Sequence, residues 1–178
     1  ASQLLEALAY LHSQNIIHKD IHPGNLLWDS LDEHLTLIDF NISSKLDAEH
    51  VRLGLADHLE GNLRYISPEQ TGRVNRAIDF RSDFYSLGVT LFEIFTGRLP
   101  CVSNDPMELI HYHIAGQHSF SDEERQFLPE PLRAFISKLM AKDPELRYQS
   151  AIGAQWDLVR CFPDSDKLAG TDFKIGSR

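Results

Sequence analysis

The stretch IIHKDIHPGNLLW, residues 16–28, decides how the rest of the chain is interpreted. Five polar side chains fall within eight positions between two apolar runs, and Pro23 and Gly24 force a turn among them. Such a turn can hold the carboxylate of Asp20 beside the amide of Asn25, as a catalytic base is held beside a metal-binding group. The residues alone leave three hypotheses open: a phosphoryl-transfer loop, a metal site, or a capped polar turn.

The histidines of the chain do not favour a zinc site. His18 and His22 are four residues apart, which is ligand spacing only on a helix, and Pro23 and Gly24 argue against a helix there. A second pair, His111 and His113, is two residues apart on a predicted helix, so the two side chains lie on different faces. We therefore expect solvated or core histidines at these positions.

Composition predicts one globular domain. The chain has 178 residues, of which 42% are apolar and 24% charged, as in ordinary folded domains. The formal net charge is −9 and no cluster of Lys or Arg interrupts it, so nucleic acid is not an expected partner. Two scattered cysteines, Cys101 and Cys161, fit a reducing compartment, and we expect a cytoplasmic location.

Apolar periodicity predicts mostly helices. They are expected over residues 2–14, 81–96, 104–116, 129–141 and 150–162. The runs NLLW and HLTLID, on either side of the turn DSLDE, predict two short strands in a hairpin. Residues 41–76 lack periodicity and are expected to form an irregular, functional excursion. No apolar run is long enough for a membrane span, and the helical pattern at residue 2 suggests a chain cut from a longer one.

A second carboxylate stands at the end of the HLTLID run. Asp39 follows Asn25 by fourteen residues, and an aromatic residue, Phe40, comes directly after it. A carboxylate at a strand end is held rigidly while the next loop leaves room for phosphate, which suits a magnesium ligand.

Five short motifs together resemble the signature set of protein kinases. HKDIHPGN, DFN, YISPE, DFYSLG and KDPELRY occur in the order and approximate spacing of that family. The longer stretch GNLRYISPEQTGRVNRAIDFRSDFYSLGVTLFEIFTGRLP resembles the Ser/Thr kinase-like module at the N-terminus of large bacterial sensor proteins, which also carry ATPase, GAF and histidine kinase regions. The resemblance covers nearly the whole chain.

The resemblance implies a fold and a division of the chain. The fold is mainly α, of the α+β family: the large C-terminal lobe of a protein kinase, with a short β-hairpin at the catalytic loop and the N-lobe absent. Residues 1–162 would form this incomplete kinase domain, and residues 163–178 a linker or tail toward a downstream domain. The implied cofactors are ATP and Mg²⁺, and the implied partners are a protein substrate or the downstream sensor and ATPase domains.

The resemblance also implies roles for individual residues. Asp20 and Asn25 would be catalytic, Asp20 accepting the proton of the substrate hydroxyl. Asn25 and Asp39 would hold the metal ions, and Asp20, His22, Asn25 and Asp39 would surround the nucleotide. His18 and Phe40 would pack as apolar spine members rather than as chemical groups.

Three further residues would hold the fold, whether or not the protein is active. Glu69 would pair with Arg147, tying the end of the activation segment to the helical core. Asp83 would accept hydrogen bonds from backbone amides of the catalytic loop, which explains a carboxylate at the start of so apolar a helix.

Several departures from the family pattern bear on activity. The chain contains no Gly-rich G-x-G-x-x-G run and no V-A-I-K-like Lys, so it is not expected to be a competent kinase alone. Lys19 replaces the Arg that reads a phosphorylated activation loop, and residues 39–69 contain no Thr. His22 stands where a Lys is usual. Asn41 replaces the Gly of D-F-G, where we expect it to tolerate a left-handed backbone, and Asn62 replaces a Thr that touches the catalytic Asp.

Three functions follow from these observations. The first is an ATP-dependent Ser/Thr protein kinase lobe within a larger signalling protein. The second is a non-catalytic, pseudokinase-like module that binds or regulates a partner. The third is a small-molecule phosphotransferase, because DIHPGNLL resembles the loop of aminoglycoside and choline kinases, although those enzymes lack the YISPEQ and SDFYSLG stretches.

Overall fold

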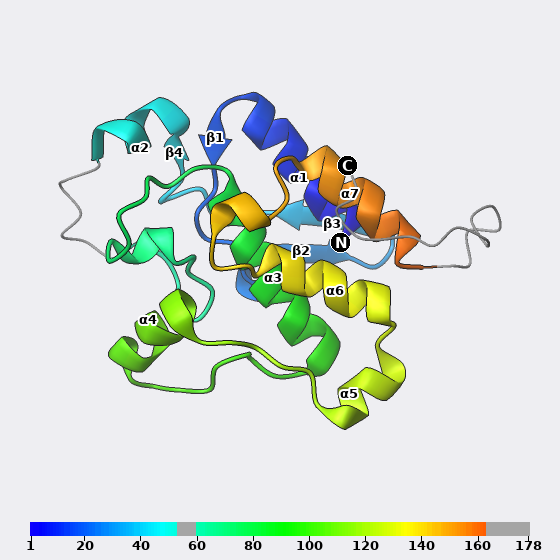
Figure 1. The fold of residues 1–178 in the computed structure, drawn as a ribbon. Helices are drawn as coiled ribbons and strands as arrows, with labels where there is room; N and C mark the ends of the chain where they lie inside the picture. Colours follow the sequence, from blue (N-terminus) through cyan, green and yellow to red (C-terminus); the bar gives the residue numbers. More distant parts are fainter. Residues whose placement is uncertain (53–59, 163–178) are drawn as a thin grey trace.

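The structure, a computed structural model, describes residues 1–52 and 60–162, without the side chains of residues 50–52. It is mostly helical, with short antiparallel strand pairs on one side (Figure 1). The α-helices are α1 (Ser2–Ser13), α2 (Leu46–Arg52), α3 (Arg81–Thr96), α4 (Pro106–Ala115), α5 (Asp122–Phe127), α6 (Glu130–Leu139) and α7 (Ala151–Arg160). The strands are β1 (Ile16–Ile17), β2 (Leu26–Asp29), β3 (His34–Leu37) and β4 (Ser44–Lys45). Single 3₁₀ turns occur at Pro23–Asn25, Glu69–Thr71 and Pro144–Leu146.

Helix α3 forms the centre of the hydrophobic core. All its residues from Ser82 to Phe92 are buried, because apolar side chains occupy nearly every face of this stretch. Helix α6 packs closely at Gly88, where a Cβ atom would lie 2.8 Å from Cβ of Leu139. The absent side chain thus sets the distance between the two helices. Burial is incomplete in the last turn of α3, where Ile94 is 55% exposed.

Helix α1 packs against α7 and against β3. Its buried leucines recur at helical spacing, as predicted: Leu4, Leu5, Leu8 and Leu11. Asn15 follows the helix with a φ of 57° and donates its N–H to the carbonyl of His12 over 3.0 Å. The expected helix end at Asn15 is confirmed, and the left-handed residue turns the chain into β1.

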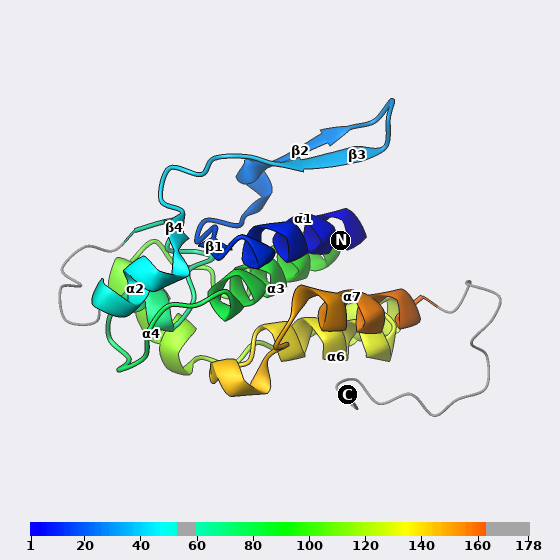
Figure 2. The same cartoon turned by 90° about the horizontal axis from the view of Figure 1, so that it is seen from above.

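The predicted hairpin is confirmed. Strands β2 and β3 pair antiparallel, with Leu26 opposite Leu37 and Asp29 opposite His34. The hairpin reaches away from the helices (Figure 2), and Leu27 and Trp28 are both more than half exposed. It therefore offers an apolar edge beside the polar turn that precedes it.

The segment 41–76 is more regular than its composition suggested. Strand β4 pairs antiparallel with β1, with Ile17 opposite Ser44, and α2 follows at once. The prediction of a wholly irregular excursion is therefore wrong for residues 44–52. Pairing of so short a strand depends on a partner about thirty residues away, which local periodicity cannot report.

Helix α5 was not expected from the sequence. Its capping box was readable, however: Ser121 Oγ accepts the N–H of Glu124, and the Glu124 carboxylate accepts the N–H of Ser121. The cap predicted at the start of α4 is present, because the Asp105 side chain accepts the N–H of Met107. Proline follows at the first helical position, as expected.

Within the described residues, no helix combines the length and apolarity that a membrane crossing requires. The predicted tail from Pro163 onward lies outside the described residues.

Candidate active site

Asp83 holds the polar loop, residues 18–25, at the start of α3. Its Oδ2 atom accepts the backbone N–H of His18 over 3.0 Å, and its Oδ1 atom accepts that of Lys19 over 2.8 Å. His12 Nε2 lies 2.9 Å from the same carboxylate, which is fully buried. These partners compensate the loss of hydration that burial imposes on the charge. The expected contact of Asp83 with the loop amides is confirmed.

Glu69 and Arg147 form a buried, two-point ion pair. The distances are 2.6 Å from Nη1 to Oε1 and 2.9 Å from Nη2 to Oε2. The remaining guanidinium donors bind backbone carbonyls of Ala141, Arg81 and Lys142. The predicted pair is confirmed, and it connects the segment before α3 with the turn after α6.

His18 is enclosed rather than available to a ligand. Its Nδ1 atom accepts the N–H of Asp20, its Nε2 atom lies 3.2 Å from the carbonyl of Ile38, and its ring packs edge-on against Phe40 at 4.7 Å. Burial lowers the pKa of His18, while the charges of Asp83, Asp20 and Asp39 oppose that shift. The ring therefore packs as a neutral group, as its expected apolar role requires.

Asp20 and Asn25 are brought together as expected. The Asn25 Nδ2 atom donates to the Asp20 carbonyl over 2.8 Å and to Asp20 Oδ2 over 3.1 Å. The amide thus fixes the carboxylate from within its own loop, helped by the 3₁₀ turn over Pro23–Asn25. Asp20 keeps part of its side chain exposed, at 19%, so the group is both positioned and reachable.

The other Asp20 oxygen is bound by a backbone amide. Asn62 N–H donates to Oδ1 over 3.0 Å, whereas the Asn62 side chain turns away and accepts the N–H of Arg64. The position where kinases usually carry a Thr therefore keeps its contact through the main chain.

His22 lies against the same carboxylate. Its Nε2 atom is 3.6 Å from Asp20 Oδ2, its Nδ1 atom accepts the N–H of Gly24 over 3.1 Å, and its ring packs on Tyr65 at 5.4 Å. Because Nδ1 is an acceptor, the neutral imidazole carries its proton on Nε2, toward Asp20. A Cβ atom at Gly24 would lie 2.9 Å from the ring carbon Cε1, so glycine makes room for the imidazole.

Asp39 is exposed at the end of β3, two residues past Leu37. The carbonyl of Asn25 accepts the N–H of Ile38 over 3.0 Å, which places Asp39 next to the residue that holds Asp20. Asp39 has a φ of 66°, and its carboxylate accepts the N–H of Asn41. Asn41 does not need the left-handed backbone that an Asn would tolerate, because the left-handed residue is Asp39, whose own side chain closes the turn.

Lys19 has two carboxylate partners that the sequence did not reveal. Its Nζ atom lies 3.0 Å from Glu49 of α2 and 3.1 Å from Glu60. The Lys19 side chain is 2% exposed, and its backbone has a φ of 70°. The polar loop is therefore joined to the following segment by an ion pair at the position where the family uses an Arg. The partners lie 30 and 41 residues away, so no local pattern predicts them.

The family follows from a match over most of the chain. The family model described as protein kinase domain matches residues 1–156. This chain belongs to the protein kinase family. Its relatives among Ser/Thr kinases of bacteria assign it to the eukaryotic-type branch, as the sequence motifs had indicated.

Three relatives illustrate the range of proteins that contain similar domains. Serine/threonine-protein kinase PknB of Mycobacterium leprae is 32% identical over 155 residues, which are 87% of this chain and 24% of that protein. Serine/threonine-protein kinase PrkC of Bacillus subtilis is 31% identical over 173 residues, 97% of the chain and 26% of that protein. Hybrid signal transduction histidine kinase G of Dictyostelium discoideum is 31% identical over 224 aligned residues, 89% of the chain and 6% of that protein. The chain spans about a quarter or less of each.

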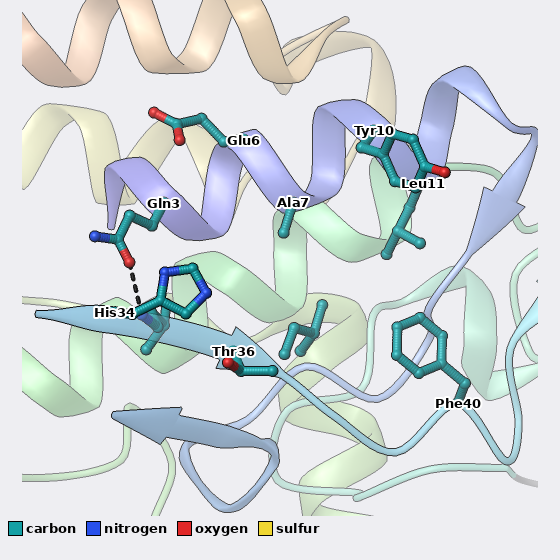
Figure 3. Close-up of a pocket in the computed structure, with 10 residues that line it drawn as sticks. Gln3, Glu6, Ala7, Tyr10, Leu11, His34, Thr36 and Phe40 are labelled. Carbon is teal, nitrogen blue, oxygen red and sulfur yellow. Dashed lines mark hydrogen bonds between the residues drawn. The ribbon is translucent and has the colours of Figure 1, made fainter. Parts of the chain in front are cut away.

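A groove of about 550 Å³ lies along α1 and β3 of this kinase domain. It is lined by one face of α1, by β3 and by Phe40 (Figure 3). Gln3 closes one end, where its side-chain oxygen accepts the N–H of Leu35 over 2.6 Å. Phe40 stands at the other end, so the groove borders the residue after Asp39 but contains neither site carboxylate.

The remaining histidine pair does not form a metal site. His111 is exposed on α4, whereas His113 is buried with its Nδ1 atom 3.1 Å from the hydroxyl of Tyr85. Across the described part of this kinase domain, no three His, Cys, Asp or Glu side chains are grouped for a metal.

Proposed function

We propose that this domain is the large catalytic lobe of a Ser/Thr protein kinase that uses ATP and Mg²⁺ within a larger signalling protein. One observation carries the proposal: both oxygens of Asp20 are fixed, by Asn25 Nδ2 and Asn62 N–H, while the carboxylate stays partly exposed. A base must be held at one place and still reach the acceptor hydroxyl. The Ser/Thr assignment is supported by the similarity to the serine/threonine-protein kinases PknB and PrkC.

The residues present fit a magnesium site. Asn25 spends its side-chain nitrogen on Asp20, and among the described residues its Oδ1 atom accepts no hydrogen bond. Asp39 offers an exposed carboxylate from a strand end one residue past the main-chain bond to Asn25. Magnesium prefers such oxygen ligands and is usually held by one or two protein side chains together with phosphate. When bound, the metal supplies positive charge that neutralises the phosphates of the nucleotide.

The protein groups have separate tasks in the transfer. Asp20 orients the acceptor hydroxyl and takes its proton, because its carboxylate is acceptor-only and held by two donors. His22 presents Nε2–H beside Asp20, where it would be a donor to an anionic group bound at the site. Asn25 holds Asp20 Oδ2 in place through its Nδ2 atom. The nucleotide also needs the Gly-rich strand and Lys of a small lobe, which residues 1–178 do not contain.

The same proposal covers the domain boundaries. Residues 1–162 form the large lobe, and residues 163–178 lead toward a further domain of the signalling protein. Its partners are then a protein substrate or other domains of the same chain, in the cytoplasm. The similarity to a hybrid histidine kinase supports a multidomain setting.

A non-catalytic module is the second candidate. The specific observation that favours it is Lys19, which is enclosed by Glu49 and Glu60 instead of being available to a phosphorylated loop. In that case the same surface would bind a partner or restrain a neighbouring domain. The two candidates differ in one measurable property, transfer of phosphate.

The experiment is a phosphate-transfer assay on the complete protein with magnesium and ATP, using Asp20→Asn and Asp39→Asn. Each change is expected to lower transfer by about 10²–10⁴-fold, because it removes the base or a metal ligand. Asp29→Asn, in the exposed hairpin, is the matched control and should keep full transfer. Equal rates in all three variants would contradict the assigned roles, and no transfer by the wild type would favour the non-catalytic module.

A further inference from the structure

Four arginines of the described residues form ion pairs with carboxylates. Arg76 lies 3.1 Å from Asp143, and the other pairs follow the same rule: Arg81 with Asp79 and Glu145, Arg98 with Glu124, and Arg147 with Glu69. Two exposed arginines near the polar loop are different. Within the described residues, Arg64 and Arg73 contact no carboxylate at ion-pair distance and are each oriented by an uncharged group.

Arg64 stands between two residues that touch the site. Asn62 donates its N–H to Asp20, and the ring of Tyr65 packs on His22. Arg64 is exposed between them, and its Nη2 atom donates to the side-chain oxygen of Asn104 over 3.2 Å. An acceptor whose hydroxyl reaches Asp20 must therefore carry its neighbouring residues past this guanidinium.

Arg73 follows the Glu69–Thr71 turn, and its side chain also reaches the beginning of α4. Its Nη2 atom lies 3.7 Å from the sulfur of Met107. Asn104 and Met107 are three residues apart at the beginning of α4, so the two guanidiniums converge on one end of that helix. A thioether and an amide hold the arginines in place without cancelling their charge.

Three carboxylates next in sequence to, or bonded with, residues of this region accept hydrogen bonds from neutral donors. Asp105 accepts the N–H of Met107, and Glu108 accepts the hydroxyl of Ser103 over 2.6 Å. Glu93 accepts the hydroxyl of Tyr65. Each carboxylate is thus turned toward a neutral donor, and the two arginines keep unshared N–H groups for an outside anion.

We propose that Arg64 and Arg73 select protein acceptors that carry acidic side chains beside the phosphorylated Ser or Thr. This rests on the proposed function, because it concerns the acceptor of that same site. The planar guanidinium can bind a carboxylate through two parallel hydrogen bonds, which a neutral or basic acceptor cannot provide. In a chain of net charge −9, these two guanidiniums give the acceptor face a local attraction for anions.

The test compares three serine peptides that differ only in the flanking pair: two Glu, two Gln or two Lys. With the complete wild-type protein, kcat/KM is expected to be about tenfold higher for the Glu peptide than for the Gln peptide, as for a charge-assisted hydrogen bond. The double variant Arg64→Glu/Arg73→Glu should invert the order, so that the Lys peptide becomes the best acceptor. Raising the salt concentration should shrink the wild-type preference.

Arg125→Glu is the matched control. Arg125 is exposed and also has a neutral partner, the carbonyl of Phe120, but it belongs to α5, well apart from α4 (Figure 1). It reverses the same charge and should leave the order of peptides unchanged. An inverted order in this variant would mean that net charge, not the two arginines, sets the preference, and would overturn the proposal.

Binding separates the failure of this proposal from failure of the proposed function. Fluorescence anisotropy of the labelled peptides measures affinity without any transfer. Transfer to all three peptides at equal rates, or best transfer to the Lys peptide, overturns the acidic preference and leaves the kinase assignment intact. Tighter binding of the Glu peptide, lost in the double variant but without transfer, supports the anion-selective face and contradicts catalysis.

Discussion

Two pairs of carboxylates in this domain have opposite surroundings. Asp83 and Glu69 are buried, and their oxygens accept hydrogen bonds from backbone amides, a guanidinium and a hydroxyl. Asp20 and Asp39 keep solvent-accessible oxygens, and each accepts fewer hydrogen bonds. The first pair binds parts of the protein to one another, and the second pair is left able to bind something else.

The difference separates evidence for the fold from evidence for chemistry. A fully satisfied buried carboxylate costs free energy if its partners are removed, and it can take no further ligand. A carboxylate that is fixed but still open can accept a proton or a metal. The four residues belong to the same motif set, so matching motifs alone does not distinguish these two tasks.

The largest effect is expected at the enclosed pair. Arg147→Ala should lower the free energy of unfolding by roughly 3–5 kcal/mol, because Glu69 would be left buried without its cation. Urea unfolding of the chain measures the change. Arg133→Ala is the control and should cost far less, because among the described residues that guanidinium binds only the carbonyl of Leu128. Similar losses in both variants would contradict the special importance of the buried pair.

Replacing one carboxylate oxygen by an amide nitrogen compares the surroundings of Asp83 and Asp20 directly. Asp83→Asn should cost about 2–4 kcal/mol of stability, because an amide nitrogen would face the N–H of His18 or Lys19. Asp20→Asn should cost less than about 1 kcal/mol, since its partly exposed side chain can be hydrated. Melting temperatures of the two variants give the comparison, and a reversed order would break it.

Acid should destabilise the domain through the protonation of buried histidines. Burial, reinforced by Lys142, lowers the pKa of His113 to about 4, so the folded protein binds fewer protons than the unfolded chain between pH 4 and 6.5. Stability is therefore full above pH 6.5 and is lost as the pH falls, by about 3 kcal/mol near pH 4. Unfolding curves at several pH values should show a smaller acid loss in His113→Leu.

His118 tests whether this acid loss is general to buried rings. Burial also lowers its pKa to about 4, with a smaller contribution from Lys142. The double variant His113→Leu/His118→Leu should lose less stability between pH 6.5 and 4 than either single variant. An unchanged pH dependence would mean that other groups control acid unfolding.

The smallest effect is expected at Glu60, the more exposed of the two carboxylate partners of Lys19. The Glu60 side chain is 42% exposed, so Glu60→Gln should cost under about 1 kcal/mol. The Glu49 side chain is 3% exposed, and Glu49→Gln should loosen α2 more. Hydrogen exchange of the α2 amides measures this difference. Equal exchange in the two variants would show that the two ion pairs of Lys19 contribute equally, which would contradict this expectation.

The sequence was sufficient where a pattern is local or a motif is distinctive. Helical spacing predicted α1, α3, α4, α6 and α7, because apolar positions repeat within each helix. The motif set predicted the contact of Asp83 with the loop and the pair of Glu69 with Arg147. These contacts span many residues, and only the resemblance made them predictable.

The sequence was insufficient where the outcome depends on distant or main-chain partners. Nothing near Lys19 indicates Glu49 and Glu60, since their separation leaves no periodic signal. The left-handed residue of this turn is Asp39, and its side chain accepts the N–H of Asn41, which residue type alone does not indicate. The contact at Asn62 is made by its backbone, which residue identity does not control. In all three cases the sequence identified the position but not the atom.

The fit of His22 over Gly24 has an evolutionary consequence. With His22 in its present rotamer, a Cβ atom at position 24 would lie 2.9 Å from the ring carbon Cε1, so a substitution there must displace the imidazole. Replacing the glycine first therefore moves the ring, whereas exchanging the histidine first for a slender side chain frees position 24. Geometry thus favours one order of substitutions along this loop, with the histidine changing before the glycine.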